Sequence, residues 1–108
     1  MVELVEENTS YDTPYIYILY SIRVDGITIG DCTIAVDDVA FCERIDIMPQ
    51  YRNYGYGTAT MKLLSDKFDT IVVAPDIEDA ARLFRAIGEE YKDESAEYLG
   101  KGYGVFVI

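Results

Sequence analysis

Ten residues in the middle of the chain, 49–58, separate two different periodicities of apolar side chains and so constrain the fold. Before them apolar residues alternate as in a β-strand, whereas Met61, Leu64 and Phe68 recur at helical spacing after them. Gly55 and Gly57 allow sharp bends and close approach to a ligand. A strand, such a loop and a helix leave free backbone N–H groups at the helix N-terminus, an arrangement that binds phosphate. The same composition is also typical of a tight strand-to-helix connection without a ligand.

Turn residues divide the remaining chain into elements. Asp25-Gly26 and Asp37-Asp38 mark hairpin turns between alternating runs. Asp76 is a plausible N-cap of a later helix, and Gly88 marks the end of that helix. The sequence therefore predicts an α+β fold, a mostly antiparallel sheet flanked by two helices in the order β-β-β-β-α-β-α-β-β. The expected strands are 2–5, 15–24, 27–36, 39–48, 71–73 and one or two within 98–108, with a polar loop at 8–14 and helices from residue 58 and from residue 76.

Length and composition predict one soluble domain spanning residues 1–108. Half of the residues are apolar, which supports a single buried core. No apolar run approaches the roughly 20 residues that cross a bilayer, and the acidic start does not resemble a signal peptide. Cys32 and Cys42 without a secretory signal favour buried thiols in the cytoplasm. The absence of histidine excludes a histidine base and most zinc sites, so no metal is expected.

Twenty acidic against nine basic residues give a net charge of −11. This charge disfavours nucleic-acid binding, because phosphates are repelled. It is typical of a well-solvated surface, and it also suits attraction of a cationic amine, polyamine or basic peptide. A polyanionic ligand would need local basic groups, for which Arg52, Lys62 and Arg85 are the candidates.

The spacing Arg52-x-x-Gly55-x-Gly57 resembles the acetyl-CoA-binding signature of the GNAT superfamily of N-acetyltransferases, Gln/Arg-x-x-Gly-x-Gly/Ala. Residues 45–51 are similar to that family's approach to the loop, and 80–88 to its second CoA-side helix. The likeness covers residues 39–88 well. It implies acetyl-CoA as co-substrate, with the main chain of Ile45 and Ile47 bonding to the pantetheine arm. The resemblance also implies that the pyrophosphate is bound by Arg52, Asn53, Tyr54, Gly55, Tyr56, Gly57 and Thr58.

The chain departs from this family in several places. The family has two helices between its first two strands, whereas the residues between Val5 and Tyr15 could supply only about two turns. The acceptor pocket is therefore expected to be open, or completed by a second subunit or by the substrate. Phe84 occupies the position where the family commonly has a tyrosine that acts as the general acid. Glu89 occupies the position where an aromatic residue is usual.

Direct acetyl transfer needs a base for the amine, and Glu43 is the candidate. In simple alternation it shares the apolar face of Phe41, Ile45 and Ile47, where burial raises the pKa of a carboxylate. The alternative is a structural Glu43, exposed by a bulge or paired with Arg44. The sequence does not identify the general acid that protonates the leaving thiolate. The candidates are Tyr54, Tyr56, Tyr91, Tyr98 and water.

Other side chains have two interpretations each. Tyr11, Tyr15, Tyr17 and Tyr20 could line a groove for an amine through cation–π contact, but they are also ordinary strand residues. Cys42 could be a nucleophile, although an inert buried thiol is favoured because no histidine activates it.

Three functions follow from the sequence. The first is an N-acetyltransferase acting on a primary amine of a small molecule or protein. The second is a CoA-binding module with weak or no catalysis that regulates or binds a partner, and the third is an acidic interaction protein without the ligand. A homodimer is a further expectation, because the C-terminal strands and the truncated pocket leave surface to cover.

Overall fold

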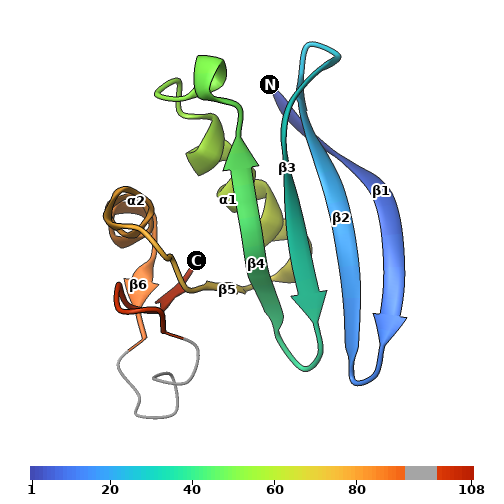
Figure 1. Cartoon of the computed structure of the whole chain (residues 1–108), viewed down its shortest axis with the longest axis vertical. Helices are drawn as coiled ribbons and strands as arrows, with labels where there is room; N and C mark the ends of the chain where they lie inside the picture. Colours follow the sequence, from blue (N-terminus) through green and yellow to red (C-terminus); the bar gives the residue numbers. More distant parts are fainter. Residues whose placement is uncertain (92–99) are drawn as a thin grey trace.

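Strand β4 lies at the centre of a seven-stranded sheet with the order β1-β2-β3-β4-β5-β7-β6 (Figure 1). The computed structural model describes residues 1–91 and 100–108. Within them the order of strands and helices agrees with the predicted order, so the α+β fold class is confirmed. The elements are β1 (Val2–Asp12), β2 (Tyr15–Val24), β3 (Ile27–Val36), β4 (Ala40–Ile47), the 3₁₀ turn η1 (Pro49–Tyr51), α1 (Tyr56–Phe68), β5 (Ile71–Val73), α2 (Glu78–Ile87), β6 (Glu89–Glu90) and β7 (Phe106–Val107).

The first four strands are consecutive antiparallel neighbours. Asp25 and Gly26 both have positive φ, 51° and 79°, as a two-residue hairpin turn requires. The predicted short first strand and polar loop are wrong, because β1 continues through Asp12 and pairs with β2 along its length. An edge strand tolerates such polar residues, since one of its edges meets water.

The two helices begin at different residues from those predicted. α1 begins at Tyr56, two residues early, so both residues after Gly55 belong to its first turn. The N-cap assigned to Asp76 is wrong: the cap is Ile77 and no side chain bonds there. α2 does end before Gly88, but that glycine is extended at φ −133°. A Cβ at Gly88 would lie 2.6 Å from the carbonyl oxygen of Val107, so close packing on β7 requires the glycine.

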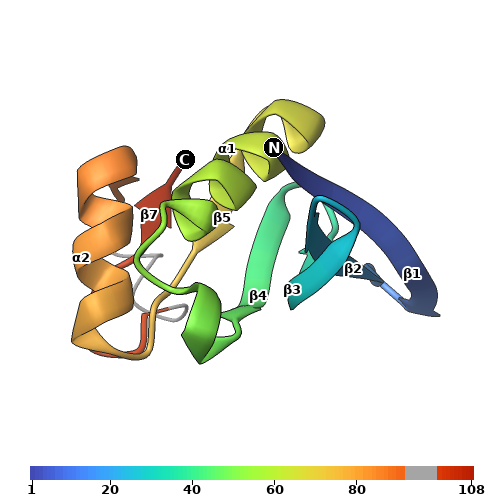
Figure 2. The same cartoon turned by 90° about the horizontal axis from the view of Figure 1, so that it is seen from above.

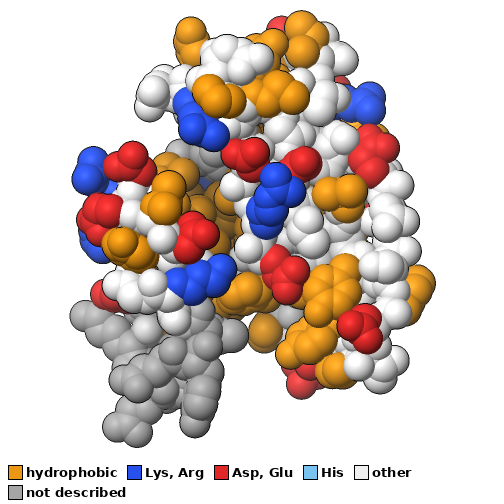
Figure 3. Space-filling view, viewed as in Figure 1, with side chains coloured by type: hydrophobic (Ala, Val, Ile, Leu, Met, Phe, Trp, Pro, Cys, Tyr) orange, Lys and Arg blue, Asp and Glu red, His pale blue; other side chains and the backbone are white. Residues whose placement is uncertain are grey.

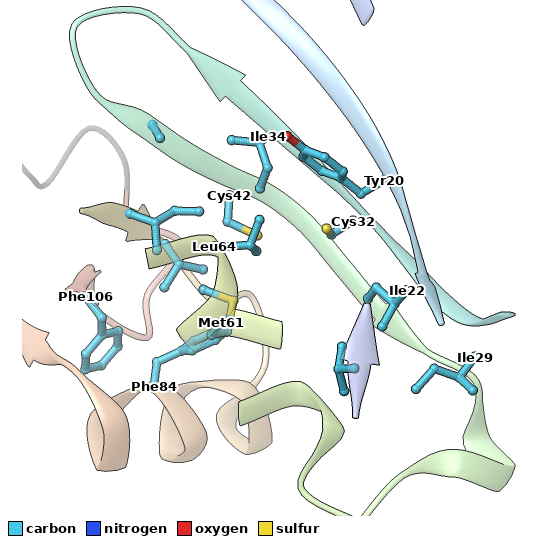
Figure 4. Close-up of a cluster of buried hydrophobic side chains, with 14 of the residues drawn as sticks. Tyr20, Ile22, Ile29, Cys32, Ile34, Cys42, Met61, Leu64, Phe84 and Phe106 are labelled. Atoms are coloured by element: carbon cyan, nitrogen blue, oxygen red, sulfur yellow. The ribbon is translucent and has the colours of Figure 1, made fainter. Parts of the chain in front are cut away.

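The main core lies between α1 and one face of the sheet, with α2 closing its side (Figures 1 and 2). The predicted helical stripes are confirmed, because Met61 and Leu64 of α1 and Phe84 of α2 are buried. Figure 4 shows these side chains pointing toward strand residues of the same cluster. The largest buried strand side chains in it are Tyr20, Ile22, Ile29, Ile34, Ile71 and Phe106.

The C-terminal region pairs on the far side of β5. β7 contacts β5 and β6 in antiparallel pairs, so two late strands exist, but the first of them precedes the predicted region. Gly102 and Gly104, both at φ 92°, form the expected bend before β7. The part of that prediction that falls on residues 98 and 99 lies outside the described residues.

The other face of β1–β4 carries no helix in the described part of the chain (Figures 1 and 2). No helix lies between Val5 and Tyr15, because the residues that follow Val5 extend β1. No helix among the described residues is long and apolar enough to span a membrane.

Candidate functional site

A cleft of about 700 Å³ opens beside the second half of β4. β4 pairs with β5 only from Ala40 to Cys42, so its later residues have a free edge on that side. Ile45 and Ile47 line one wall of the cleft, and α2 lines the other with Leu83 and Phe84 among its residues. Figure 3 shows the hollow between α2 and the strands, with hydrophobic side chains in its depth. An elongated ligand with an apolar arm therefore fits along β4.

The loop at the mouth of this cleft presents free backbone donors. The N–H of Arg52 bonds to the carbonyl of Pro49 at 3.3 Å, and the next bonded amide is Ala59, which donates to Gly55 at 3.0 Å. Between them, the six N–H groups of residues 53–58 donate to no described residue. Gly55, at φ 81°, ends the loop and caps α1, whose positive dipole end adds to these donors. The arrangement suits a diphosphate.

Arg52 lies in the cleft but is already engaged with the strand. Its Nε donates a hydrogen bond to the Ile47 carbonyl at 2.7 Å, and its guanidinium lies 3.2 Å from Asp46. Arg44 lies 3.7 Å from Asp46 and 3.4 Å from Asp31, which extends the alternating charges across the open face. Since these pairs are largely exposed, each contributes little to stability.

Most residues assigned to the co-substrate from the sequence line this cleft. The structure brings together Ile45, Ile47, Arg52, Asn53, Gly55, Tyr56, Gly57 and Thr58. Tyr54 lies outside the lining, 69% exposed, with its ring stacked on Tyr56. Of the basic groups, Lys62 and Arg85 do not line the cleft, whereas Arg82 of α2 does and lies 3.8 Å from Asp79. Neither Asp79 nor Arg82 was assigned to the site from the sequence, although both lie on the same helix as Phe84.

Glu43 occupies a β-bulge rather than a buried position. Thr33 pairs with Arg44 and Ile34 with Cys42, so Glu43 is the extra residue between them. The alternation expected for it is wrong: Ile45 and Ile47 join the main core, whereas Phe41 belongs to a second cluster with Ala74 and Val105. The carboxylate is exposed and outside the cleft lining. A bulge next to a cleft commonly re-aims one side chain, so the position suits a functional residue as well as a structural one.

Besides desolvation, the negative charge of Glu43 contributes to a raised pKa of the phenol of Tyr17, which lies on β2. The pKa of the Tyr17 phenol is raised, first by desolvation and then by the negative charges of Glu43 and Asp12. Tyr15 stacks obliquely on Tyr17, with ring centroids 6.0 Å apart. In the described part of the chain, neither Glu43 nor Asp12 makes an ion pair or side-chain hydrogen bond. This patch of Asp12, Tyr15, Tyr17 and Glu43, here called the acidic tyrosine patch, therefore has a negative potential that no described ion pair cancels.

Phe84 packs as the helical spacing predicts. It is 2% exposed, its ring lies 6.4 Å from that of Phe106, and it lines the inner cleft. Of the phenols considered as an acid, Tyr56 lines the cleft and Tyr54 lies outside the lining, stacked on Tyr56. Tyr98 is outside the described residues. Tyr91 pairs through its main chain with Val105.

Both cysteines are buried free thiols, which confirms the interpretation of Cys42 as a core side chain. Burial raises the pKa of each thiol to about 12. Because the thiolate is the nucleophile, neither thiol is activated at neutral pH. Among the described residues, no group of three potential metal ligands occurs.

Known proteins resemble this chain in structure but not in sequence. No protein-family model matches the sequence, and no curated protein matches it significantly. A GNAT family acetyltransferase from Elizabethkingia anophelis, solved with acetyl-CoA bound, superposes with a TM-score of 0.66 at 10% identity, over 99% of this chain and 97% of that one. A Klebsiella pneumoniae protein described as an acyl-CoA N-acyltransferase gives a TM-score of 0.67 at 20% identity, over 84% and 70% of the two chains.

A tandem GNAT protein of the clavulanic acid biosynthesis pathway gives a TM-score of 0.60 at 20% identity. The match covers 77% of this chain but only 31% of that longer protein. Together these similarities show that the chain has the GNAT fold, as the Arg-x-x-Gly-x-Gly spacing indicated.

Proposed function

We propose that this protein is an N-acetyltransferase that moves an acetyl group from acetyl-CoA directly to a primary amine. The observation that carries the proposal is the row of unpaired amides at residues 53–58, at the mouth of a cleft along the free edge of β4. A neighbour that this chain matches over 97% of its length was solved with acetyl-CoA bound, which supports acetyl-CoA as the co-substrate.

The amides of residues 53–58 bind the diphosphate, and Ile45 and Ile47 flank the pantetheine arm through the main chain. Arg52 already donates to the Ile47 carbonyl, which leaves the Ile45 main chain as the principal partner of the arm. Leu83 and Phe84 exclude water from the inner cleft, where the thioester lies.

Glu43 is the proposed base. An ammonium acceptor first loses a proton to Glu43, directly or through water, and the free amine then attacks the thioester carbonyl carbon. The C–N bond forms and the C–S bond breaks, and the second proton that the attacking nitrogen loses passes, directly or through water, to the thiolate, which leaves as CoA. The open face and the free edge of β4 beyond Cys42 allow the amine to approach from the side opposite α1.

The acidic tyrosine patch supports a cationic acceptor. The negative charges of Asp12 and Glu43 act on the Tyr17 phenol, whose ring lies 6.0 Å from that of Tyr15. An ammonium gains both Coulomb attraction and cation–π contact there. The same acidity supports the prediction that nucleic acid is not a partner. The cytoplasmic location remains a prediction that rests on the two free cysteines. A homodimer also remains a prediction.

The second candidate function is a CoA-binding module with little or no turnover. Two observations favour it: the buried Phe84 provides no phenol in the cleft, and Glu43 is not among the residues that line it. The third, an acidic interaction protein without a ligand, is disfavoured by the free amides.

Calorimetric titration with acetyl-CoA, followed by assay of released thiol with a panel of amines, separates the three. The acetyltransferase binds acetyl-CoA and releases thiol only when an amine is added, whereas the module binds without release. Absence of binding at millimolar acetyl-CoA would falsify both of the first two functions.

A further inference from the structure

Two tyrosines flank the glycine that caps α1 and stack on each other. The ring centroids of Tyr54 and Tyr56 lie 5.9 Å apart with their planes at 30°. Tyr56 packs against the main core and lines the cleft, whereas Tyr54 is 69% exposed. Gly55, at φ 81°, reverses the chain between them. The inner ring is anchored, and the outer ring lies on the surface against it.

The fold makes little use of Tyr54. It belongs to neither hydrophobic cluster, and in the described part of the chain its side chain makes no hydrogen bond or ion pair and no ring contact other than the stacking on Tyr56. Its outer face is an exposed aromatic surface between Asn53 and Gly55, which both line the cleft.

The position of the diphosphate determines what lies near this ring. CoA has two arms on its diphosphate. In the proposed complex the pantetheine arm runs along Ile45 and Ile47, which line the cleft together with Phe84, and the nucleoside arm leaves outward across the loop. Tyr54 lies within the same six residues whose amides bind the diphosphate.

We propose that the exposed face of Tyr54, braced by Tyr56, is a stacking platform for the nucleobase of the co-substrate. This inference rests on the proposed function and adds the nucleobase subsite to it. Stacking of a base on an aromatic side chain is worth roughly 1–3 kcal/mol, so the platform contributes a measurable part of the affinity without reading base identity.

The test compares two donors on two proteins. Acetyl-CoA carries the nucleoside, whereas acetyl-4′-phosphopantetheine lacks it. Tyr54→Ala is expected to weaken acetyl-CoA binding about tenfold, which corresponds to roughly 1.4 kcal/mol of stacking, and to change the Kd of the truncated donor less than twofold. Tyr54→Phe retains the affinity because it retains the ring. Tyr11→Ala is the control, since Tyr11 is equally exposed at 77% but lies on β1, away from the loop.

A second measurement uses the absence of tryptophan from the chain. In Tyr54→Trp the single indole reports directly on stacking, so acetyl-CoA is expected to quench its fluorescence and the truncated donor is not.

The outcomes are distinct. Equal loss of both donors in Tyr54→Ala shows that the ring only shapes the loop, and no loss of either shows that the base lies elsewhere; both results overturn the platform. If the unmodified protein binds neither donor, the proposed function itself fails.

Discussion

The Nε of Arg52 lies 2.7 Å from the carbonyl oxygen of Ile47, which joins the loop arginine to the last residue of β4. The same guanidinium lies 3.2 Å from Asp46, and Arg44 lies on the other side of that carboxylate. Arg52 therefore acts on the shape of the strand end as well as on the charge at the cleft. Lysine cannot replace it, because an ammonium lacks the planar fork that serves two acceptors at once.

Arg52→Lys is expected to weaken acetyl-CoA binding threefold to tenfold although the charge is kept. The physical reason is the loss of the bond to Ile47, which loosens the wall that flanks the pantetheine arm. Calorimetric titration measures the effect. Unchanged affinity in this variant would show that only the charge of Arg52 matters.

Asp46→Asn is expected to strengthen acetyl-CoA binding about twofold to threefold. The substitution removes a negative charge from a cleft that receives a polyanion, and Arg52 keeps its bond to Ile47. The gain should be larger at low ionic strength, where screening is weaker. Asp66→Asn removes the same charge from the exposed surface of α1 and serves as the control. Weaker binding in Asp46→Asn would mean that the carboxylate positions Arg52 rather than opposes the ligand.

Gly57→Ala is expected to separate stability from binding. Gly57 lies in the first turn of α1 and a Cβ there would be 3.5 Å from Leu83, an ordinary contact. Alanine in a helix is favoured over glycine by roughly 0.5–1 kcal/mol, so the free energy of unfolding should rise. The added methyl group projects into the cleft, so acetyl-CoA affinity should fall about tenfold or more. Urea unfolding and titration of one preparation give both numbers, and a variant that binds as well as the original would place the diphosphate away from Gly57.

Glu43→Gln is expected to lower kcat about a hundredfold, the lower range for loss of a general base, and to leave the Kd of acetyl-CoA within twofold. Glutamine keeps the size of the side chain, and the bulge carries no core packing. Glu3→Gln, on the exposed edge strand β1, is the matched control. Full activity of Glu43→Gln would return this residue to its structural interpretation as a bulge glutamate.

The sequence predicted what depends on local pattern. Alternation and the two acidic turns placed β2 and β3 to the residue, and helical spacing identified Met61, Leu64 and Phe84 as core. The glycine spacing located the turn between β4 and α1, because glycine at positive φ, as at Gly55, is a backbone requirement visible in the sequence itself.

The errors arose where tertiary pairing overrides local pattern. Residues 8–12 are polar and were expected to form a loop, but pairing with β2 makes them strand. The bulge at Glu43 depends on how β3 and β4 align, which alternation along one strand cannot reveal. The fork from Arg52 to Ile47 and Asp46 likewise joins residues five and six positions apart through a turn whose geometry the sequence does not specify.

The two buried thiols predict a loss of stability in alkali. Burial raises the pKa of Cys32 and of Cys42 to about 12, whereas an unfolded cysteine ionises near pH 8.5. Above that pH the unfolded chain loses thiol protons that the folded chain retains, so the unfolded state is favoured as pH rises toward 12. Tyr20, whose pKa is raised by desolvation and by the charge of Glu6, acts in the same direction at higher pH.

Urea unfolding at pH 7, 9 and 10 should therefore show a falling free energy of unfolding. Cys42→Ala should flatten this decline while lowering stability at pH 7 through lost packing. An equally steep decline in Cys42→Ala would show that this thiol does not contribute to the alkaline transition.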